Sequence, residues 1–396
     1  MAIEILAASV GALLGLGIAE SVAHRRRLAR IPTRVHVAGT RGKSSVTRLI
    51  ASGLRAGDVR CAAKTTGTLA RMILPDAREV PIFRPRGPNI VEQTRVVALA
   101  ESLGAQALVI ECMALQPELH WLSENKLVRA THGVITNCRA DHLDVMGPTE
   151  ADVARCLAGM IPVKGTLITA ERRHLGILRE ACEDRKTRLV TVDDDDLEAV
   201  SEAMMAGFTH VEHRDNVALA LKVLDELGVS QQAGLQGMWA GQPDPGALTE
   251  HEIDFFGRRI VFVNAFAAND PESTQGIWDK AVTRHRDLDE VVAVFNLRAD
   301  RPSRTHQLAR ETTFWHEADH VVLMGSGAYH FVREASAVGI GPERFVYADH
   351  DQLSEVFESI VELCNRSALV VGMANIGEHG LGLARLFRNR RVLEVA

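Results

Sequence analysis

The sequence predicts an α/β protein with three parts: a domain built on a parallel sheet that carries a glycine loop, a smaller C-terminal domain of Rossmann-like α/β type, and an apolar N-terminal helix. Three observations predict it. Short apolar runs alternate with helical patterns from Arg34 onward, and this alternation indicates parallel strands joined by crossover helices. A glycine loop follows the first apolar run, and a charge-free stretch, residues 5–19, precedes it.

Composition sets broad limits on the class of protein. The chain has 396 residues, of which 46% are hydrophobic and 24% charged, enough for two globular domains. Its formal net charge of −6 argues against a general nucleic-acid-binding protein, so we expect no nucleic-acid partner. The six cysteines form no C-x-x-C pair, which weakens zinc and thiol-redox interpretations and is typical of a reducing compartment.

The apolar stretch at the N-terminus has a basic flank. Residues 5–19 carry no charge between Glu4 and Glu20, and residues 24–27 read His-Arg-Arg-Arg. A helix of this length spans about 22 Å, short of the roughly 30 Å of a hydrocarbon core. Positive charge after the apolar run argues against a cleaved signal peptide and predicts that the domains after it stay cytoplasmic. We expect residues 1–31 to anchor the protein in the cell membrane; the alternative is an amphipathic or buried helix docked on a partner.

The pattern that follows divides the chain into two domains. The first, residues 32–242, has expected strands at 35–38, 107–110, 133–136 and 165–169 and expected helices at 91–103, 152–160 and 215–227. The stretch 237–246 is rich in Gly, Pro, Gln and Asp and is typical of a linker. A second alternating set begins after it, so the second domain is residues 243–396, with expected strands at 260–263, 291–295, 320–324 and 368–371.

The glycine loop lies between the first expected strand and a helix. Its residues are Gly39, Thr40, Arg41, Gly42, Lys43, Ser44 and Ser45. In this order backbone N–H groups converge on a phosphate, the lysine reaches the terminal phosphates and a serine hydroxyl binds Mg²⁺. The general nucleotide-loop pattern would need a glycine where this chain has Val37, and the shorter Gly-Thr-x-Gly-Lys-Ser form fits instead. The loop predicts nucleoside triphosphate binding; the alternative is a surface turn that carries a lysine.

Acidic and imidazole side chains follow two further strands. Glu111 comes directly after one expected strand, and Asp141 and His142 follow another. Ligands in open α/β sheets bind outside the carboxyl ends of the strands, so these groups are expected near the glycine loop. A carboxylate and a hydroxyl beside triphosphate oxygens are what Mg²⁺ requires. Ser44 and Glu111 are therefore candidate ligands, and His142 is a candidate for a second metal or a phosphate.

These residues resemble the Mur ligase superfamily of ATP-dependent amide ligases, which includes folylpolyglutamate synthase, and the expected fold is Mur-ligase-like. The matching segments are Gly39-Thr40-Arg41-Gly42-Lys43-Ser44, Glu111, Asp141-His142-Leu143-Asp144 and His213-Arg214-Asp215-Asn216, the last similar to an adenine-contacting His-Asn-x-x-Asn segment. Residues 84–93 and 264–274 are more closely similar to the ligase subunit of bacterial poly-γ-glutamate synthase. The N-terminal apolar segment with its basic flank is similar to that subunit too.

The resemblance implies an ATP-dependent ligase that forms carbon–nitrogen bonds with the help of Mg²⁺. It would activate a glutamate γ-carboxylate as an acyl phosphate and join it to another glutamate, making poly-γ-glutamate for a capsule. Its partners would be the poly-γ-glutamate chain and small integral membrane synthase subunits, and a homo-oligomer is a further expectation. Two rivals stay open: another ligase of the superfamily, such as a folylpolyglutamate or peptidoglycan-precursor ligase, and a nucleotide-dependent scaffold of a membrane complex.

The resemblance also implies roles for individual residues. Lys43, Glu111 and His142 are the expected catalytic residues: Lys43 binds phosphates, Ser44 and Glu111 hold the first metal, and His142 helps to hold a second. The expected nucleotide-binding set is Gly39, Thr40, Arg41, Gly42, Lys43, Ser44, Ser45, Asn216 near adenine, and Asn269 in a second-domain segment that approaches the nucleotide when the domains close.

An anionic substrate requires cations in its site. The candidates are Arg84, Arg86, Arg139, Arg298 and Arg301. The alternative for Arg84 and Arg86 is an ordinary exposed loop. For Arg298 and Arg301, which follow a second-domain strand, the alternative is a surface salt-bridge cluster.

One position departs from the family pattern. Where many of these ligases carry a carbamylated lysine that bridges to the second metal, this chain has Leu157. The second metal site must therefore be weaker or built differently. The segment 64–68, Lys-Thr-Thr-Gly-Thr, is similar to a threonine-rich turn that the superfamily places near the phosphates, or is a simple turn. The glycine-rich segment 372–380 has an open role.

Overall fold

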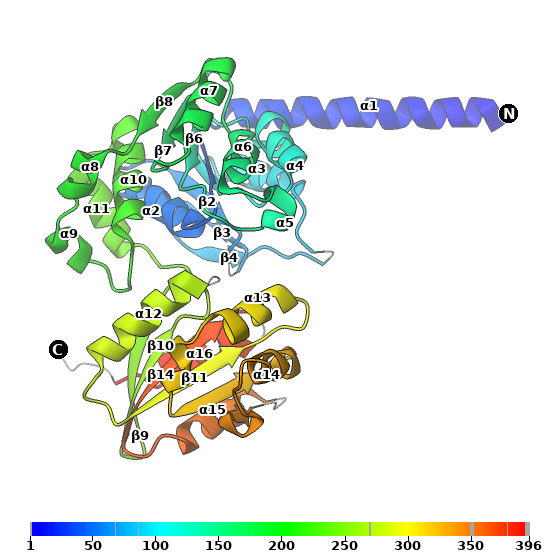
Figure 1. Cartoon of the computed structure of the whole chain (residues 1–396). Helices are drawn as coiled ribbons and strands as arrows, with labels where there is room; N and C mark the ends of the chain where they lie inside the picture. Colours follow the sequence, from blue (N-terminus) through cyan, green and yellow to red (C-terminus); the bar gives the residue numbers. More distant parts are fainter. Residues whose placement is uncertain are drawn as a thin grey trace. The chain divides into compact units, whose positions relative to one another are not determined.

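The structure is a computed structural model of the chain, and it describes residues 2–67, 69–85, 87–268, 271–348, 352–377 and 379–392. The chain forms two compact units, Met1–Pro243 and Asp244–Ala396 (Figure 1). Each unit has a mostly parallel sheet with helices on both faces, as the alternation of apolar runs predicts.

Unit 1 is built on an eight-stranded sheet in the order β4-β3-β2-β5-β1-β6-β7-β8. Its strands are β1 (Thr33–Ala38), β2 (Cys61–Thr65), β3 (Arg71–Ile73), β4 (Glu79–Pro81), β5 (Ala107–Glu111), β6 (His132–Ile135), β7 (Thr166–Thr169) and β8 (Arg188–Thr191). β3 and β4 add an antiparallel edge to six parallel strands. The four strands expected in this unit are confirmed as β1, β5, β6 and β7.

Helices cover both faces of this sheet. One layer is α2 (Lys43–Ala56), α10 (Arg214–Glu226) and α11 (Gln231–Ala240), whose apolar side chains share a core with Val35 and Val37 of β1. The other layer is α3 (Glu92–Ser102), α6 (Glu150–Ala158) and α7 (Leu175–Arg185). Shorter helices connect these elements: α4 (Pro117–Leu122), η1 (Ser123–Val128), α5 (Leu143–Met146), α8 (Asp194–Ala199) and α9 (Glu202–Ala206).

The linker expected at 237–246 is partly wrong, because α11 continues to Ala240. Gly237 lies where a side chain would meet the backbone of α2: a Cβ built there would be 2.3 Å from the Ser52 carbonyl oxygen. The missing side chain lets α11 pack directly on α2. This glycine is therefore a helix-packing position, which a local composition pattern does not distinguish from a flexible one.

Helix α1 (Ala2–Ala29) has an exposed apolar part and a C-terminal end, residues 24–29 (its foot), that packs against the rest of unit 1. Ile5, Leu13 and Ile18 are more than half exposed, and the large apolar side chains of Ile3 to Val22 lie all around the helix. Of the residues described, only this helix is long and apolar enough to cross a membrane. At its foot, Leu28 is buried in the core that α3 shares, and His24 contacts the Leu127 carbonyl oxygen of η1 at 2.8 Å.

Unit 2 is built on a six-stranded sheet in the order β13-β12-β11-β14-β10-β9. Its strands are β9 (Thr249–Phe255), β10 (Arg258–Asn264), β11 (Glu290–Asn296), β12 (His320–Met324), β13 (Phe345–Tyr347) and β14 (Ser367–Ala374). All neighbours are parallel except β9 and β10. Two aromatic-rich cores lie between this sheet and the helices that cover it. The helices are α12 (Pro271–Arg284), α13 (Pro302–His306), α14 (Ala328–Ser336), α15 (Leu353–Glu362) and α16 (His379–Asn389), with the short η2 (Gln307–Glu311), η3 (Phe314–Glu317) and η4 (Pro342–Arg344). The four strands expected here are confirmed as β10, β11, β12 and β14.

Candidate functional site

The glycine loop lies at the carboxyl ends of three adjacent parallel strands. β1 is paired on one side with β5, where Val37 is opposite Glu111, and on the other with β6, where Ala38 is opposite Ile135. The loop leaves β1 at Ala38 and enters α2 at Lys43. Strand pairing alone therefore brings Glu111 and the residues after Ile135 beside the loop, at the position where open α/β sheets bind ligands.

Two glycines of the loop are required by close packing. Gly39 has a φ of 127°, and a Cβ built on it would lie 2.0 Å from Thr136 Oγ1. Gly42, the N-cap of α2, has a φ of 81°, and its Cβ would lie 2.5 Å from Asn216 Oδ1. Left-handed backbone and missing side chains at both positions bring the loop close to its neighbours and leave the first N–H groups of α2 without a side-chain cap.

Two residues after β6 hold the loop in place. The Thr40 hydroxyl and the Arg41 N–H both donate to Asn137 Oδ1, at 2.7 and 3.2 Å. The Arg41 carbonyl accepts from the Thr136 hydroxyl at 2.6 Å and from Asn137 Nδ2 at 3.1 Å. Sequence reasoning assigned no role to Thr136 and Asn137. Their signal was their position directly after a strand that neighbours β1.

Lys43 lies over the loop that precedes it. Its ammonium donates to the carbonyl oxygens of Gly39 and Thr40, at 2.8 and 3.2 Å. A cation held by loop carbonyls at a helix N-terminus is placed to attract an anionic group to the same spot.

Ser44 and Glu111 form the pair that the sequence predicts. The Ser44 hydroxyl donates to Glu111 Oε2 at 2.9 Å, and the Thr66 N–H donates to the same oxygen at 2.6 Å. Burial raises the pKa of the Glu111 carboxyl above its ordinary value, although the charge of Lys43 and the Thr66 N–H oppose the rise. A buried carboxylate beside a hydroxyl is a donor set that suits a small divalent cation.

The turn after β2 packs against this pair. A Cβ built on Gly67 would lie 2.4 Å from Ser44 Oγ. The Thr66 hydroxyl oxygen accepts a hydrogen bond from Arg84 Nη2 at 2.9 Å. Arg84 also forms a bidentate ion pair with Glu92. The threonine-rich turn thus lies at the candidate site, whereas the sequence alone left a simple turn equally open.

His142 is placed differently from Ser44 and Glu111. It is the residue before α5, has a φ of 48°, and its Nε2 lies 3.8 Å from Asp141 Oδ1. Its side chain is 42% exposed. In the described part of the chain no three His, Cys, Asp or Glu side chains are grouped as a metal site.

Leu157 is enclosed by an apolar core. It is 1% exposed and belongs to the cluster that contains Cys138, Val153 and Ile161. These neighbours offer no oxygen or nitrogen ligand from their side chains. The position that carries a lysine in many of the resembling ligases is therefore part of the hydrophobic core here.

Asn216 lies against the glycine loop. It is in the first turn of α10, is buried, and donates through Nδ2 to Glu212 Oε1 at 2.8 Å. The His210 ring lies 3.5 Å from Glu212 Oε2. Sequence reasoning placed Asn216 near the nucleotide and missed Glu212, which orients the asparagine amide.

The predicted substrate cations belong to both units. Arg139 is exposed in the segment that follows β6. Arg298 forms a bidentate ion pair with Asp300, and Arg301 is exposed before α13; both follow β11 of unit 2. Arg86 and Asn269 lie outside the described residues.

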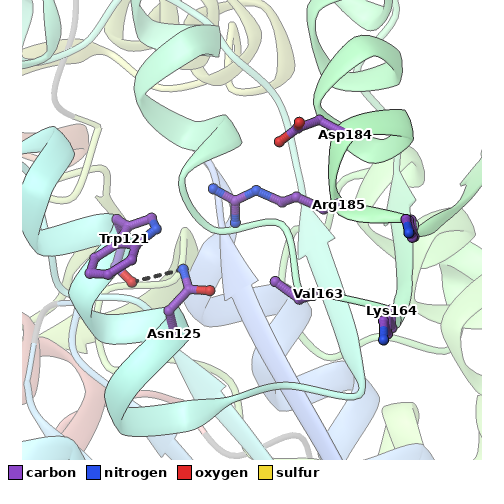
Figure 2. Close-up of a pocket in the computed structure, with 7 residues that line it drawn as sticks. Trp121, Asn125, Val163, Lys164, Asp184 and Arg185 are labelled. Atoms are coloured by element: carbon purple, nitrogen blue, oxygen red, sulfur yellow. Dashed lines mark hydrogen bonds between the residues drawn. The ribbon is translucent and has the colours of Figure 1, made fainter.

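A surface cavity of about 350 Å³ lies at the other edge of the unit 1 sheet (Figure 2). Its lining residues are Trp121, Asn125, Val163, Lys164, Asp184, Arg185 and Lys186. Lys164 and Lys186 come just before β7 and β8, so the cavity is at the amino ends of the strands. It contains none of the predicted site residues.

Comparison with known proteins identifies the family. Residues 37–230 match the Mur ligase middle domain, and residues 250–390 match the C-terminal domain of poly-gamma-glutamate synthase CapB. The chain is 33% identical over 370 residues to the PGA synthase CapB of Bacillus subtilis (strain 168), covering 93% of each protein. The chain belongs to the CapB family. It is also 39% identical over 315 residues to the capsule biosynthesis protein CapB of Bacillus anthracis, covering 79% of this chain and 67% of that protein.

Solved structures show that this CapB-family chain has a Mur-ligase-like fold. The folylpolyglutamate synthase/dihydrofolate synthase of Yersinia pestis, complexed with AMPPNP and Mn ion, matches with a TM-score of 0.68 and 15% identity, covering 93% of this chain and 92% of that one. The folylpolyglutamate synthase of Mycobacterium tuberculosis, complexed with ADP, matches with a TM-score of 0.67 and 18% identity, covering 97% and 98%. At these identities the likeness concerns the fold.

Proposed function

We propose that this CapB-family protein is an ATP-dependent ligase that activates a glutamate γ-carboxylate and joins it to the amine of another glutamate, building poly-γ-glutamate. The observation that carries the proposal is the Ser44–Glu111 pair beside the glycine loop, in a chain that shares nearly its whole length with a PGA synthase. The folylpolyglutamate synthase alternative has support from the shared fold only.

The triphosphate of ATP is proposed to bind over residues 39–45. Three features support this: the Lys43 ammonium, the uncapped N-terminus of α2, and the brace formed by Thr136 and Asn137. Asn216 is the proposed residue on the adenine side, and Asn269 is proposed to approach from unit 2. Because phosphoryl transfer depends mainly on positioning and charge neutralisation, a preformed loop of this kind suits it.

The residues present fit a divalent cation, which we propose to be Mg²⁺. Ser44 Oγ and Glu111 Oε2 are 2.9 Å apart and offer a hydroxyl and a buried carboxylate, the hard oxygen donors that Mg²⁺ prefers. When bound, the cation neutralises charge on the phosphate oxygens. His142 is the proposed contributor to a second metal, which the apolar surroundings of Leu157 leave with fewer ligands than in lysine-bearing relatives.

The proposed reaction has two balanced steps. An oxygen of the γ-carboxylate attacks the γ-phosphorus of ATP, the bond to the β-phosphate oxygen breaks, and ADP leaves. The amine of the second glutamate then attacks the acyl carbon, the carbon–oxygen bond to phosphate breaks, and the amine loses a proton. Lys43 stabilises the transferring phosphoryl group, and exclusion of water protects the acyl phosphate.

Candidate cations for the anionic substrate are Arg139, Arg298 and Arg301, with Arg86 outside the described residues. Arg84 would bind substrate only by leaving its ion pair with Glu92.

Helix α1 is proposed to anchor the protein in the cell membrane with both units in the cytoplasm. Its apolar side chains are exposed on all sides, and its basic residues follow the apolar stretch. Small integral membrane synthase subunits are the proposed partners of this helix. A homo-oligomer is also proposed.

The test uses full-length protein in detergent with ATP, Mg²⁺ and glutamate. The ligase produces γ-linked glutamate with stoichiometric ADP, and hydroxylamine traps the acyl phosphate as a hydroxamate. Glu111→Gln abolishes both products, whereas Glu101→Gln, which alters a carboxylate paired with Arg30 near the foot of α1, retains them. Amide formation only with folate or muramyl nucleotides would indicate a different ligase, and ATP binding without turnover would indicate a scaffold.

A further inference from the structure

An ion cluster of Lys64, Glu92 and Arg84 lies next to the turn that contacts the Ser44–Glu111 pair. Lys64, the fourth residue of β2, is completely enclosed, and its ammonium lies 3.0 Å from Glu92 Oε1. Met113 Sδ is 3.5 Å from the same nitrogen. Fully buried lysines are rare because taking an ammonium out of water is costly, and an apolar residue is usually as stable in such a place. Burying Lys64 therefore costs free energy of folding, and packing in the core does not explain why a lysine is present there.

Glu92 joins Lys64 to a second cation. The carboxylate of Glu92, the first residue of α3, accepts from Arg84 Nε at 2.6 Å and from Arg84 Nη2 at 2.7 Å. The N-terminus of a helix favours a negative charge at that position. Burial would raise the pKa of Glu92, but the hydrogen bonds from Arg84 and the charge of Lys64 hold it below its ordinary value. One ionised carboxylate thus fixes two cations from separate segments.

The cluster reaches the candidate metal site through one turn. Arg84 Nη2 also donates to Thr66 Oγ1 at 2.9 Å, and the Thr66 N–H donates to Glu111 Oε2 at 2.6 Å. Gly67, the next residue, lies directly against Ser44. Lys64 therefore fixes the start of the turn and Arg84 fixes its middle, so the turn has little freedom to move away from Glu111.

We propose that Lys64 and Arg84, held together by Glu92, are positioning residues that lock the turn 65–67 and so fix the Glu111 carboxylate for the divalent cation of the nucleotide. The inference rests on the proposed function, because it concerns the same metal site. Residues that orient a metal ligand typically change metal affinity about 10- to 100-fold when removed. Loss of either cation is thus expected to weaken metal binding without weakening nucleotide binding in the absence of metal.

The test measures Mn²⁺ binding to the full-length protein with AMP-PNP, by electron paramagnetic resonance. Lys64→Met shortens the side chain by one atom and removes its charge, and Arg84→Lys keeps a charge and removes the bidentate geometry. The matched control is Glu79→Gln, which weakens the Arg48–Glu79 pair between α2 and β4, another ion pair whose side chains are mostly buried. Lys64→Met and Arg84→Lys should raise the half-saturating Mn²⁺ concentration about 10-fold or more. Glu79→Gln should leave it unchanged, and AMP-PNP affinity in EDTA should be the same in all.

Several outcomes overturn the inference. One is a folded Lys64→Met protein with parental Mn²⁺ affinity. Another is an Arg84→Lys protein whose glutamate KM rises while its Mn²⁺ affinity is unchanged, because that result marks Arg84 as a substrate-binding residue. If Lys64→Met fails to fold, Arg84→Lys still decides, because that side chain is partly exposed. A parent protein that binds Mn²⁺–AMP-PNP but forms no amide overturns the ligase function alone. A parent that does not bind it overturns both.

Discussion

Replacing Gly42 by alanine tests how the nucleotide loop is held. Gly42 is the N-cap of α2 with a φ of 81°, in the left-handed region that favours glycine. A Cβ built there would lie 2.5 Å from Asn216 Oδ1, well inside contact distance. The asparagine amide is not free to turn, because its Nδ2 donates to the buried Glu212 carboxylate at 2.8 Å. Gly42→Ala therefore strains the backbone and displaces a buried hydrogen-bonded group.

The expected loss of stability follows from these two terms. A left-handed backbone costs a non-glycine residue about 1–2 kcal/mol. A buried amide separated from its acceptor costs about 1–3 kcal/mol. The free energy of unfolding of unit 1 should thus fall by about 2–5 kcal/mol, a large part of the stability of an ordinary domain.

The assay is hydrogen exchange of the α2 and α10 amides across a urea titration of the full-length protein. This measurement reports the opening of unit 1 separately from unit 2. Gly176→Ala in α7 is the matched control, because nothing lies within 4 Å of a Cβ built there, and it should gain about 0.5–1 kcal/mol. In an Asn216→Ala background, Gly42→Ala should cost only the backbone term of about 1–2 kcal/mol.

Two results would refute the reasoning. One is a Gly42→Ala protein whose free energy of unfolding falls by less than about 1 kcal/mol, since the backbone term alone exceeds that. The other is an equal cost in the parent and Asn216→Ala backgrounds, because the contact with Asn216 would then play no part.

Four further changes have expected outcomes. Lys43→Ala should lower ATP turnover at least about 100-fold with an unchanged circular dichroism spectrum, and turnover near the parental rate would contradict its role. Deleting residues 2–22, which stops before the buried foot of α1, should move the protein from the membrane pellet to the soluble fraction; continued pelleting would contradict the anchor. Leu157→Lys should lose about 3–5 kcal/mol of stability by burying an unpaired ammonium, against less than about 1.5 for Leu157→Met, and equal losses would contradict an apolar site. The pKa of Glu92 is lowered on folding, so its contribution to stability is present above the unfolded pKa of about 4.3 and is lost as pH falls through the folded value. Acid should therefore destabilise the parent protein more than the Glu92→Gln protein. Equal dependence of the free energy of unfolding on pH in the two proteins would contradict the ion pair.

The main features of unit 1 could be predicted because their signals are local. The apolar run before Gly39 and the helical spacing after Lys43 predict a strand, a loop and a helix, which are β1, the glycine loop and α2. Glu111 could be placed beside Ser44 because both follow strands of one parallel sheet, and parallel strands present their carboxyl ends at one edge.

Contacts between distant segments could not be predicted in the same way. Asn137 braces a loop almost a hundred positions earlier, and its role depends on β6 being the neighbour of β1 rather than of β5. The sequence makes Arg84 a candidate substrate cation with an exposed loop as the alternative, and in the structure Arg84 is paired with Glu92 and Thr66. An arginine in a polar loop has the same sequence pattern whether it binds a substrate or forms an ion pair within the protein.

Residue order and periodicity are enough to predict the α/β class, a glycine loop between a strand and a helix, the nearness of Ser44 and Glu111, and an apolar N-terminal helix, because each depends on the pattern within one or two segments. The burial of Lys64 beside Glu92 and the packing role of Gly237 are visible only in the folded chain. Burial and ion pairing cannot be read from local patterns, because they depend on which faces of the helices and the sheet meet. Chain order fixes what each segment can form, and packing fixes which side chains lose water.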